Sequence, residues 1–179
     1  MADRDATFDT AQYMQDPERL QRRTSAGERE MLERFLDFQR DTLIWKLSGL
    51  TREQLVAPRT PSGLSLLGIV KHLGYVERSW FQRRFMGRHV YIAWRGVQPD
   101  ADFHIADDES PESICAFYRT EIEEARRIVA AADSLDTVAA NPERPVTLRW
   151  ILIHMIEETA RHVGHADIFR ELTDGQTGE

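Results

Sequence analysis

Residues 147–169 read TLRWILIHMIEETARHVGHADIF, and this stretch decides the fold. Its apolar side chains recur mostly at three- and four-residue steps, which is the period of an amphipathic helix. Thr147 stands directly before the first of them, where a helix N-cap is expected. The stretch therefore predicts a helix from Thr147 to about Leu172, with an inward face of Leu148, Ile151, Leu152, Met155, Thr159, Ala166 and Phe169.

Two ionisable side chains share that apolar face. Glu158 and His162 fall inside it or at its edge, whereas Glu157 falls on the opposite, solvated side. Residues four apart project from adjacent turns of one helix face. A buried carboxylate without a partner costs several kcal/mol, so Glu158 requires a partner. A cation is the simplest one.

The rest of the chain predicts more helices and gives almost no strand signal. Ser25 and Glu28 have the spacing of a capping box, whereas Ser110 is followed by Ser113 where a full box would have a glutamate or glutamine. We therefore expect an all-α protein. Its other helices are expected over residues 25–48, from Ser62 or Ser65 to near Gly87, and from Ser110 to about Ala132, with one extra turn over residues 51–55.

The second of these helices offers a third polar residue at a helix contact. His72 lies on the flank of its apolar face and can face a neighbouring helix. Two histidines and one carboxylate with open coordination positions suit Zn, Ni, Fe or Mn. Three protein ligands leave room for water or substrate, which is the pattern of catalytic sites. His72, Glu158 and His162 thus form a candidate metal site. The alternative is that each is a satisfied core residue, because a Glu–His pair at this spacing often occurs by chance.

Residues 88–109 form a long connection that is rich in His, Tyr, Trp and Asp. Loops of this length are usually functional or mobile, and the alternative is a solvated connector with a few packed aromatics. The domain is expected over residues 25–173. Before it, residues 1–24 are expected to form a polar extension, which is no secretory signal because it has no apolar core. After it, residues 174–179 are expected to form a frayed tail.

Composition excludes several classes of partner. The formal net charge of −7 argues against nucleic acid, since a polyanion binder should be basic. No stretch approaches the ~20 apolar residues that span a bilayer. Cys115 is the only cysteine, so no internal disulfide can form, in agreement with a reducing compartment. We expect a cytoplasmic protein with neither nucleic-acid nor membrane partners.

Other polar residues are assigned structural positions. Glu77, at the edge of an apolar face, is expected in a buried ion pair with an arginine. His154 is expected to be packed or partly exposed, and Cys115 to be a small core hydrophobe. His89 and His104 fit surface positions in the long connection.

Two motifs carry a resemblance to a known family: EETARHVGH at residues 157–165 and SLLGIVKHL at residues 65–73. With the order of the helices, they make residues 25–173 resemble the DinB-like superfamily. The branch concerned is related to mycothiol-dependent maleylpyruvate isomerase and to bacterial thiol transferases. The resemblance implies a four-helix bundle in up-down-down-up order, with a long loop between helices two and three. It also implies a metal at one end of the central cavity and no DNA binding.

Carried over by position, the resemblance places the metal ligands at His72, Glu158 and His162. Many relatives have histidine where Glu158 stands, whereas the mycothiol-type members resemble this chain in using glutamate. Many relatives have glutamine where this chain has His165, so the resemblance assigns that residue no role.

The resemblance favours a divalent-metal-dependent transferase that activates a low-molecular-weight thiol, such as mycothiol, for attack on a small electrophile. Zinc is the first candidate metal, and nickel, iron and manganese are the others. A hydrolase that uses the same site to ionise water is an alternative. So is a non-enzymatic bundle that binds a small molecule or a partner. A homodimer fits this kind of bundle.

Overall fold

The computed structural model describes residues 26–95, 100–141 and 145–177. The expected N-terminal extension over residues 1–24 lies outside these residues, as does the end of the expected tail. The elements are α3 (Glu28–Trp45), α4 (Arg52–Val56), α5 (Leu66–Glu77), the π-helix η1 (Arg78–Phe85), the short 3-10 helix η2 (Ala93–Arg95), α6 (Pro111–Ala131) and α7 (Leu148–Asp174). Apart from one isolated bridge between Val138 and Thr147, the described residues contain no β-structure. The all-α prediction is therefore confirmed for them.

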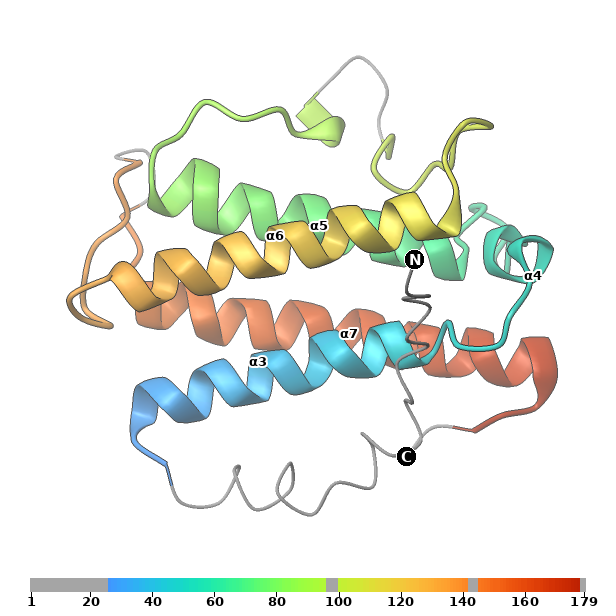
Figure 1. The fold of residues 1–179 in the computed structure, drawn as a ribbon, viewed down its shortest axis with the longest axis horizontal. Helices are drawn as coiled ribbons and strands as arrows, with labels where there is room; N and C mark the ends of the chain where they lie inside the picture. Colours follow the sequence, from blue (N-terminus) through green and yellow to red (C-terminus); the bar gives the residue numbers. More distant parts are fainter. Residues whose placement is uncertain (1–25, 96–99, 142–144, 178–179) are drawn as a thin grey trace, which may run out of the picture.

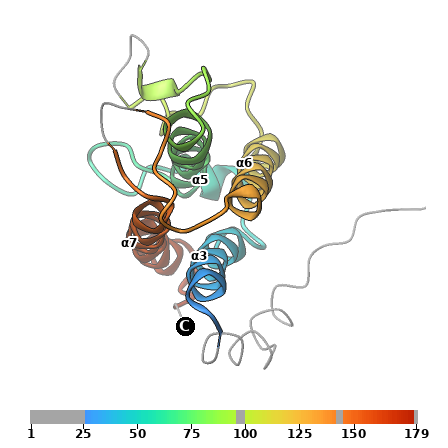
Figure 2. The ribbon, with the colours of Figure 1, turned by 90° about the vertical axis from the view of Figure 1, so that its left-hand side faces the viewer.

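The long helices α3, α5, α6 and α7 lie side by side (Figure 1), and a view along them places them around a common centre (Figure 2). Helix α5 packs against α6 and α7, and α3 packs against α7. Their facing sides supply a continuous apolar core, in which Leu43, Leu67, Ile69, Val70, Tyr118, Leu148, Ile151 and Met155 are fully buried. None of the described helices is long and apolar enough to cross a membrane.

Side-chain caps fix the starts of the two helices that carry the candidate site. The Ser65 hydroxyl accepts a hydrogen bond from the backbone N–H of Gly68 at 3.1 Å, and α5 begins after it. The Thr147 hydroxyl accepts one from the backbone N–H of Trp150 at 3.3 Å, and α7 begins after it. Of the two serines proposed as caps for the second helix, Ser65 is the cap, and the cap predicted at Thr147 is confirmed.

One other helix start differs from expectation, and one capping motif is more complete than expected. Helix α3 begins at Glu28 with Gly27 as its N-cap, which is later than the expected start at residue 25, and Ser25 itself lies outside the described residues. Glycine tolerates the N-cap position well, which explains the later start. At the start of α6, the Ser113 hydroxyl accepts from the backbone N–H of Ser110 at 3.0 Å and completes the capping box. A serine at this position reaches back as a glutamate would.

Helix α5 continues without a break into the wider turns of η1. The backbone N–H of Met86 donates to the carbonyl of Phe81, five residues earlier, and Gly87 then ends the segment with a φ of 70°. The predicted end near Gly87 is confirmed. The change to π-helical hydrogen bonding was not predicted, because Phe81 and Phe85 remain buried and keep an apolar spacing that suits an α-helix.

A buried ion pair joins α3 to α5. Arg40 donates from Nε to Oε1 of Glu77 at 2.7 Å and from its NH2 group to Oε2 at 2.6 Å. Both side chains are almost fully buried. Arg40 also donates to Asp37 on its own helix at 2.8 Å. The arginine partner predicted for Glu77 is thus confirmed. Two parallel hydrogen bonds from a guanidinium group to a carboxylate are the strongest form of such a contact.

Candidate metal centre

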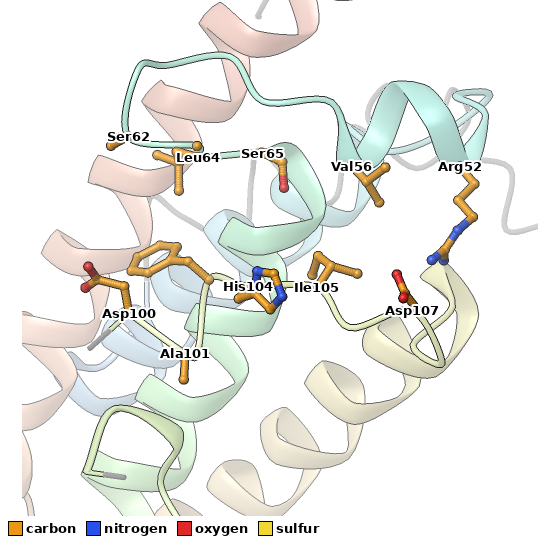
Figure 3. Close-up of a pocket in the computed structure, with 12 residues that line it drawn as sticks. Arg52, Val56, Ser62, Leu64, Ser65, Asp100, Ala101, His104, Ile105 and Asp107 are labelled. Atoms are coloured by element: carbon orange, nitrogen blue, oxygen red, sulfur yellow. The ribbon is translucent and has the colours of Figure 1, made fainter. Parts of the chain in front are cut away.

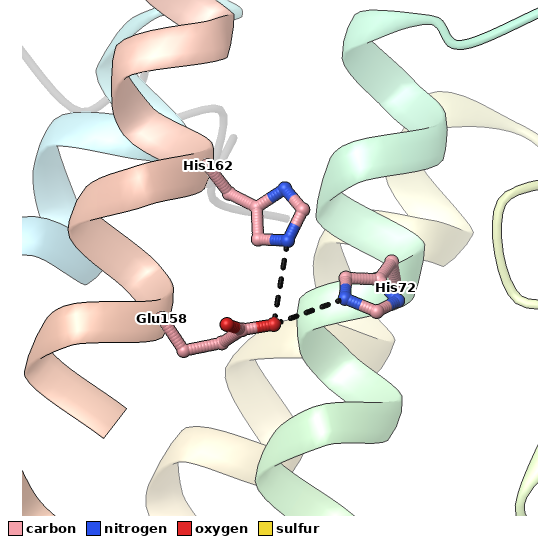
Figure 4. Close-up of side chains that lie close together, drawn as sticks. All are labelled: His72, Glu158 and His162. Carbon is pink, nitrogen blue, oxygen red and sulfur yellow. Dashed lines mark ion pairs between the residues drawn. The ribbon is translucent and has the colours of Figure 1, made fainter. Parts of the chain in front are cut away.

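Three side chains from α5 and α7 meet between those helices (Figure 4). The Nε2 atom of His162 lies 3.4 Å from Oε1 of Glu158, and the Nε2 atom of His72 lies 3.6 Å from the same oxygen. One potential ligand atom from each residue falls within 4.8 Å of the other two. The structure therefore brings together the three residues that the sequence singled out.

The periodicity of α7 explains how two of these side chains reach one point. Glu158 and His162 are four residues apart, so they project from adjacent turns of the face that packs on α5. His162 is buried, and Glu158 is half-buried. Glu157 points away: it is exposed and pairs with Arg161 on the outer surface. Neighbouring glutamates on one helix thus have different environments, as predicted.

His162 sets the charge state of the neighbouring carboxyl group. It is the largest cause that holds the pKa of Glu158 well below its usual range. This effect outweighs the partial burial of Glu158, which acts in the opposite direction. The carboxylate is ionised at neutral pH and presents a negative charge to the space that the three residues share.

The donor atoms fit a divalent cation. The buried Nε2 atom of His72 has no hydrogen-bond partner within the part of the chain that the structure describes, although a polar atom in that position normally has one. Zinc binds nitrogen and oxygen ligands at about 2.0–2.2 Å, which puts neighbouring ligands of a tetrahedral ion roughly 3.3–3.5 Å apart. The separations of 3.4 and 3.6 Å measured to Glu158 are close to that spacing.

A fourth residue joins the site from the long connection. A carboxylate oxygen of Asp102 accepts a hydrogen bond from Nδ1 of His72, on the side of the ring that faces away from Glu158. The ring of Phe103 stacks on the same imidazole, with centroids 4.0 Å apart and planes 12° from parallel. Sequence reasoning missed Asp102, because several aspartates lie in that connection and no periodicity distinguishes a buried one.

The remaining histidines lie outside the group of three. His154 is half-buried and stacks on Trp150 with ring centroids 5.1 Å apart, so its predicted packed position is confirmed. His89 and His104 are exposed, as predicted. His165 is also exposed and meets the ring of His162 edge-on at 5.5 Å.

A pocket of about 960 Å³ lies beside the site, between α4, the start of α5 and the residues that follow position 99 (Figure 3). A volume of this size accommodates a small molecule. Phe103 belongs to both places, since it lines the pocket and stacks on His72. The pocket walls are Arg52, Val56, Ser62, Gly63, Leu64, Ser65, Asp100, Ala101, Phe103, His104, Ile105 and Asp107.

Comparison with known proteins identifies a family for this chain. The family model described as mycothiol-S-transferase matches residues 31–175. That span includes the three clustered side chains as well as Asp102. No curated protein matches the chain.

Proposed function

Because the chain belongs to the mycothiol-S-transferase family, within the DinB-like superfamily, we propose that it transfers a low-molecular-weight thiol of the mycothiol type to a small electrophile with the help of a divalent metal. The metal would be held by His72, Glu158 and His162. The observation that carries this proposal is the convergence of their ligand atoms within 4.8 Å inside the span that the family matches.

A bound divalent cation would deprotonate a coordinating thiol, whose free pKa of about 8.5 leaves it mostly protonated at neutral pH. The chain supplies the remaining requirements. Glu158 contributes a negative charge, and the two histidines would contribute ring nitrogens as ligands. Phe103 covers one face of the His72 ring and keeps water from it. The thiolate sulfur forms a bond to the electrophilic carbon, the bond to the leaving group breaks, and the thiol proton passes to solvent.

Zinc is the metal we propose first, with nickel, iron and manganese as the other candidates. Two imidazole nitrogens and one carboxylate oxygen suit all four ions, and zinc is the ion that most often binds such ligands in a four-coordinate site.

We also infer that the long helices follow the up-down-down-up order implied by the resemblance. The course of the colours along α3, α5, α6 and α7 in Figure 1 supports this order. So does the long connection between η1 and α6, because two adjacent parallel helices need a crossover that returns along their length. A homodimer stays a prediction.

The direct test is thiol conjugation by metal-loaded protein. With mycothiol and a reactive electrophile such as monochlorobimane, we expect thiol-dependent product from the wild type. In Glu158→Gln the rate should fall by at least about 100-fold, because losing a ligand charge removes several kcal/mol of stabilisation. Glu157→Gln is the matched control, since the same change falls on an exposed residue of the same helix, and it should retain the wild-type rate.

Two results would contradict the proposal. One is the absence of conjugation with mycothiol and with bacillithiol across several electrophiles. The other is turnover of esters or amides that needs no thiol, which would indicate the hydrolase alternative.

The chain's own thiol should be dispensable. Cys115 lies on α6, half-buried against the core, and burial raises its pKa, so it is a poor nucleophile at neutral pH. We expect Cys115→Ala to conjugate mycothiol within about twofold of the wild type, because the sulfur that is transferred comes from outside. Steady-state rates of the two proteins at equal metal loading give the comparison. A loss of activity in the folded variant would instead place Cys115 in the reaction.

A further inference from the structure

We propose that Asp102 is a positioning residue that fixes the tautomer of His72, so that Nε2 of this histidine presents its lone pair to the space shared with Glu158 and His162. The inference rests on the proposed function, because it gives that lone pair a metal to bind.

The contact that carries the inference lies on the far side of the His72 ring. A neutral imidazole has a proton on one nitrogen and a lone pair on the other, and the hydrogen bond made by one nitrogen decides the state of the other. Asp102 accepts at Nδ1, so the proton belongs there and the lone pair belongs to Nε2. The Nε2 atom is the one that lies 3.6 Å from Glu158. Carboxylate–histidine pairs of this kind orient metal ligands and raise their basicity.

Asp102 is itself held firmly in place. It is only 2% exposed, although aspartate is rarely buried to this extent without a partner. It lies within a turn that is closed by a hydrogen bond from the backbone N–H of Phe103 to the carbonyl of Asp100 at 2.9 Å. After it, the ammonium of Lys71 donates to the carbonyl of His104 at 2.7 Å. The backbone on both sides of Asp102 is therefore fixed, on the C-terminal side by a residue of α5.

A second contact anchors the same connection at Glu109, near its C-terminal end. Lys71 also pairs with Glu109 at 2.7 Å, and Glu109 accepts from the backbone N–H of Ala106 at 2.8 Å. Lys71 directly precedes His72, so the helix turn that carries the ligand also carries the anchor for the segment that orients it.

A glycine on α5 allows this segment to approach so closely. A Cβ atom added at Gly68 would lie 2.5 Å from the carbonyl oxygen of Phe103, which is a backbone atom that cannot move alone. Gly68 stands four residues before His72, on the same face of the helix. Any larger side chain at Gly68 would push the segment away from the helix and Asp102 away from His72.

The competing interpretation is that Asp102 only stabilises the folded loop. Asp102→Asn tests it, because the side chain keeps its size while losing its charge. Asp108→Asn is the matched control, since it makes the same change at an exposed position of the same connection. We expect zinc affinity, measured by competition with a chromophoric chelator, to fall about 10- to 100-fold in Asp102→Asn and to stay unchanged in Asp108→Asn.

The second readout needs no metal. The imidazole nitrogen chemical shifts of His72, assigned by their loss in His72→Gln, report the tautomer of the neutral ring. The wild type should carry the proton on Nδ1, and Asp102→Asn should shift the ring towards the other tautomer. A purely structural role would lower thermal stability without moving either readout.

The outcomes separate this inference from the proposed function. Tight zinc binding by the wild type together with equal affinity in Asp102→Asn would overturn the role of Asp102 and leave the metal site intact. A wild-type ring with its proton on Nε2 would also overturn it. A wild type that binds no metal, but whose Nδ1 tautomer depends on Asp102, would support the positioning and contradict the proposed function.

Gly68→Ala provides an independent variant, because it alters neither Asp102 nor any ligand. The displaced segment should lower zinc affinity in the same direction as Asp102→Asn and shift the same tautomer. Unchanged affinity and tautomer in a folded Gly68→Ala protein would overturn the dependence of His72 on this segment.

Discussion

Untagged protein should contain about one divalent metal ion per chain, and His162→Ala should contain almost none, because two remaining ligands hold an ion far more weakly than three. Mass spectrometry of the purified proteins measures both values. Glu157→Ala should keep the full metal content, since Glu157 points outward and pairs with Arg161. It is a strict control, because it directly precedes the ligand Glu158 on the same helix.

The reverse result would be equally informative. A wild type that takes up no Zn, Ni, Mn or Fe even after loading would contradict the metal site, and the pair on α7 would then serve packing or the binding of a small molecule. His162→Gln, which stays closer in volume to the wild type, separates loss of the ligand from loss of the fold. Its unfolding temperature in the presence of a chelator should match that of the metal-free wild type.

Glu77→Leu should lower the free energy of unfolding by about 3–5 kcal/mol, because it leaves the Arg40 guanidinium buried without its two-point partner. For a chain of this length the loss corresponds to roughly 6–20 °C in Tm. Asp37 remains within 2.8 Å of Arg40 but binds only one of its nitrogens, so it offsets little of the loss. Denaturant titration of the metal-free protein measures the change without the contribution of a bound ion.

Two control variants test whether the loss of stability comes from the buried, unpaired charge of Arg40. Glu123→Ala removes an exposed partner of Arg126 and should change stability by less than about 1 kcal/mol. The double variant Arg40→Met with Glu77→Leu should recover most of the stability, because an apolar pair of similar volume replaces the ion pair without leaving a charge behind. A small effect in Glu77→Leu alone would show that Arg40 reaches water or another carboxylate when Glu77 is removed.

The parts of the site that sequence predicted are those governed by helix periodicity. Glu158 and His162 stand on the inward face of α7 because of their spacing, and the same spacing places Glu157 outside. His72 followed from its position on the flank of an apolar face, although only the packing of α5 against α7 brings it to the other two.

Asp102 has no such signal. Its burial depends on a backbone approach at Gly68 and an anchor at Lys71, both of which are contacts between segments distant in sequence. The π-helical hydrogen bonding of η1 could not be predicted from the sequence for a related reason. An apolar pair such as Phe81 and Phe85 looks alike whether the backbone between them is α-helical or π-helical.

The proposed ligands come from two different helices, and this has a consequence for the order of folding and metal binding. Glu158 and His162 belong to a single stretch of helix, so in the proposed metal site they would supply two ligands as soon as that helix exists. His72 and its carboxylate partner would join them only after α5 has packed against α7. Under this proposal, tight metal binding would depend on the completed fold, whereas weak binding would not.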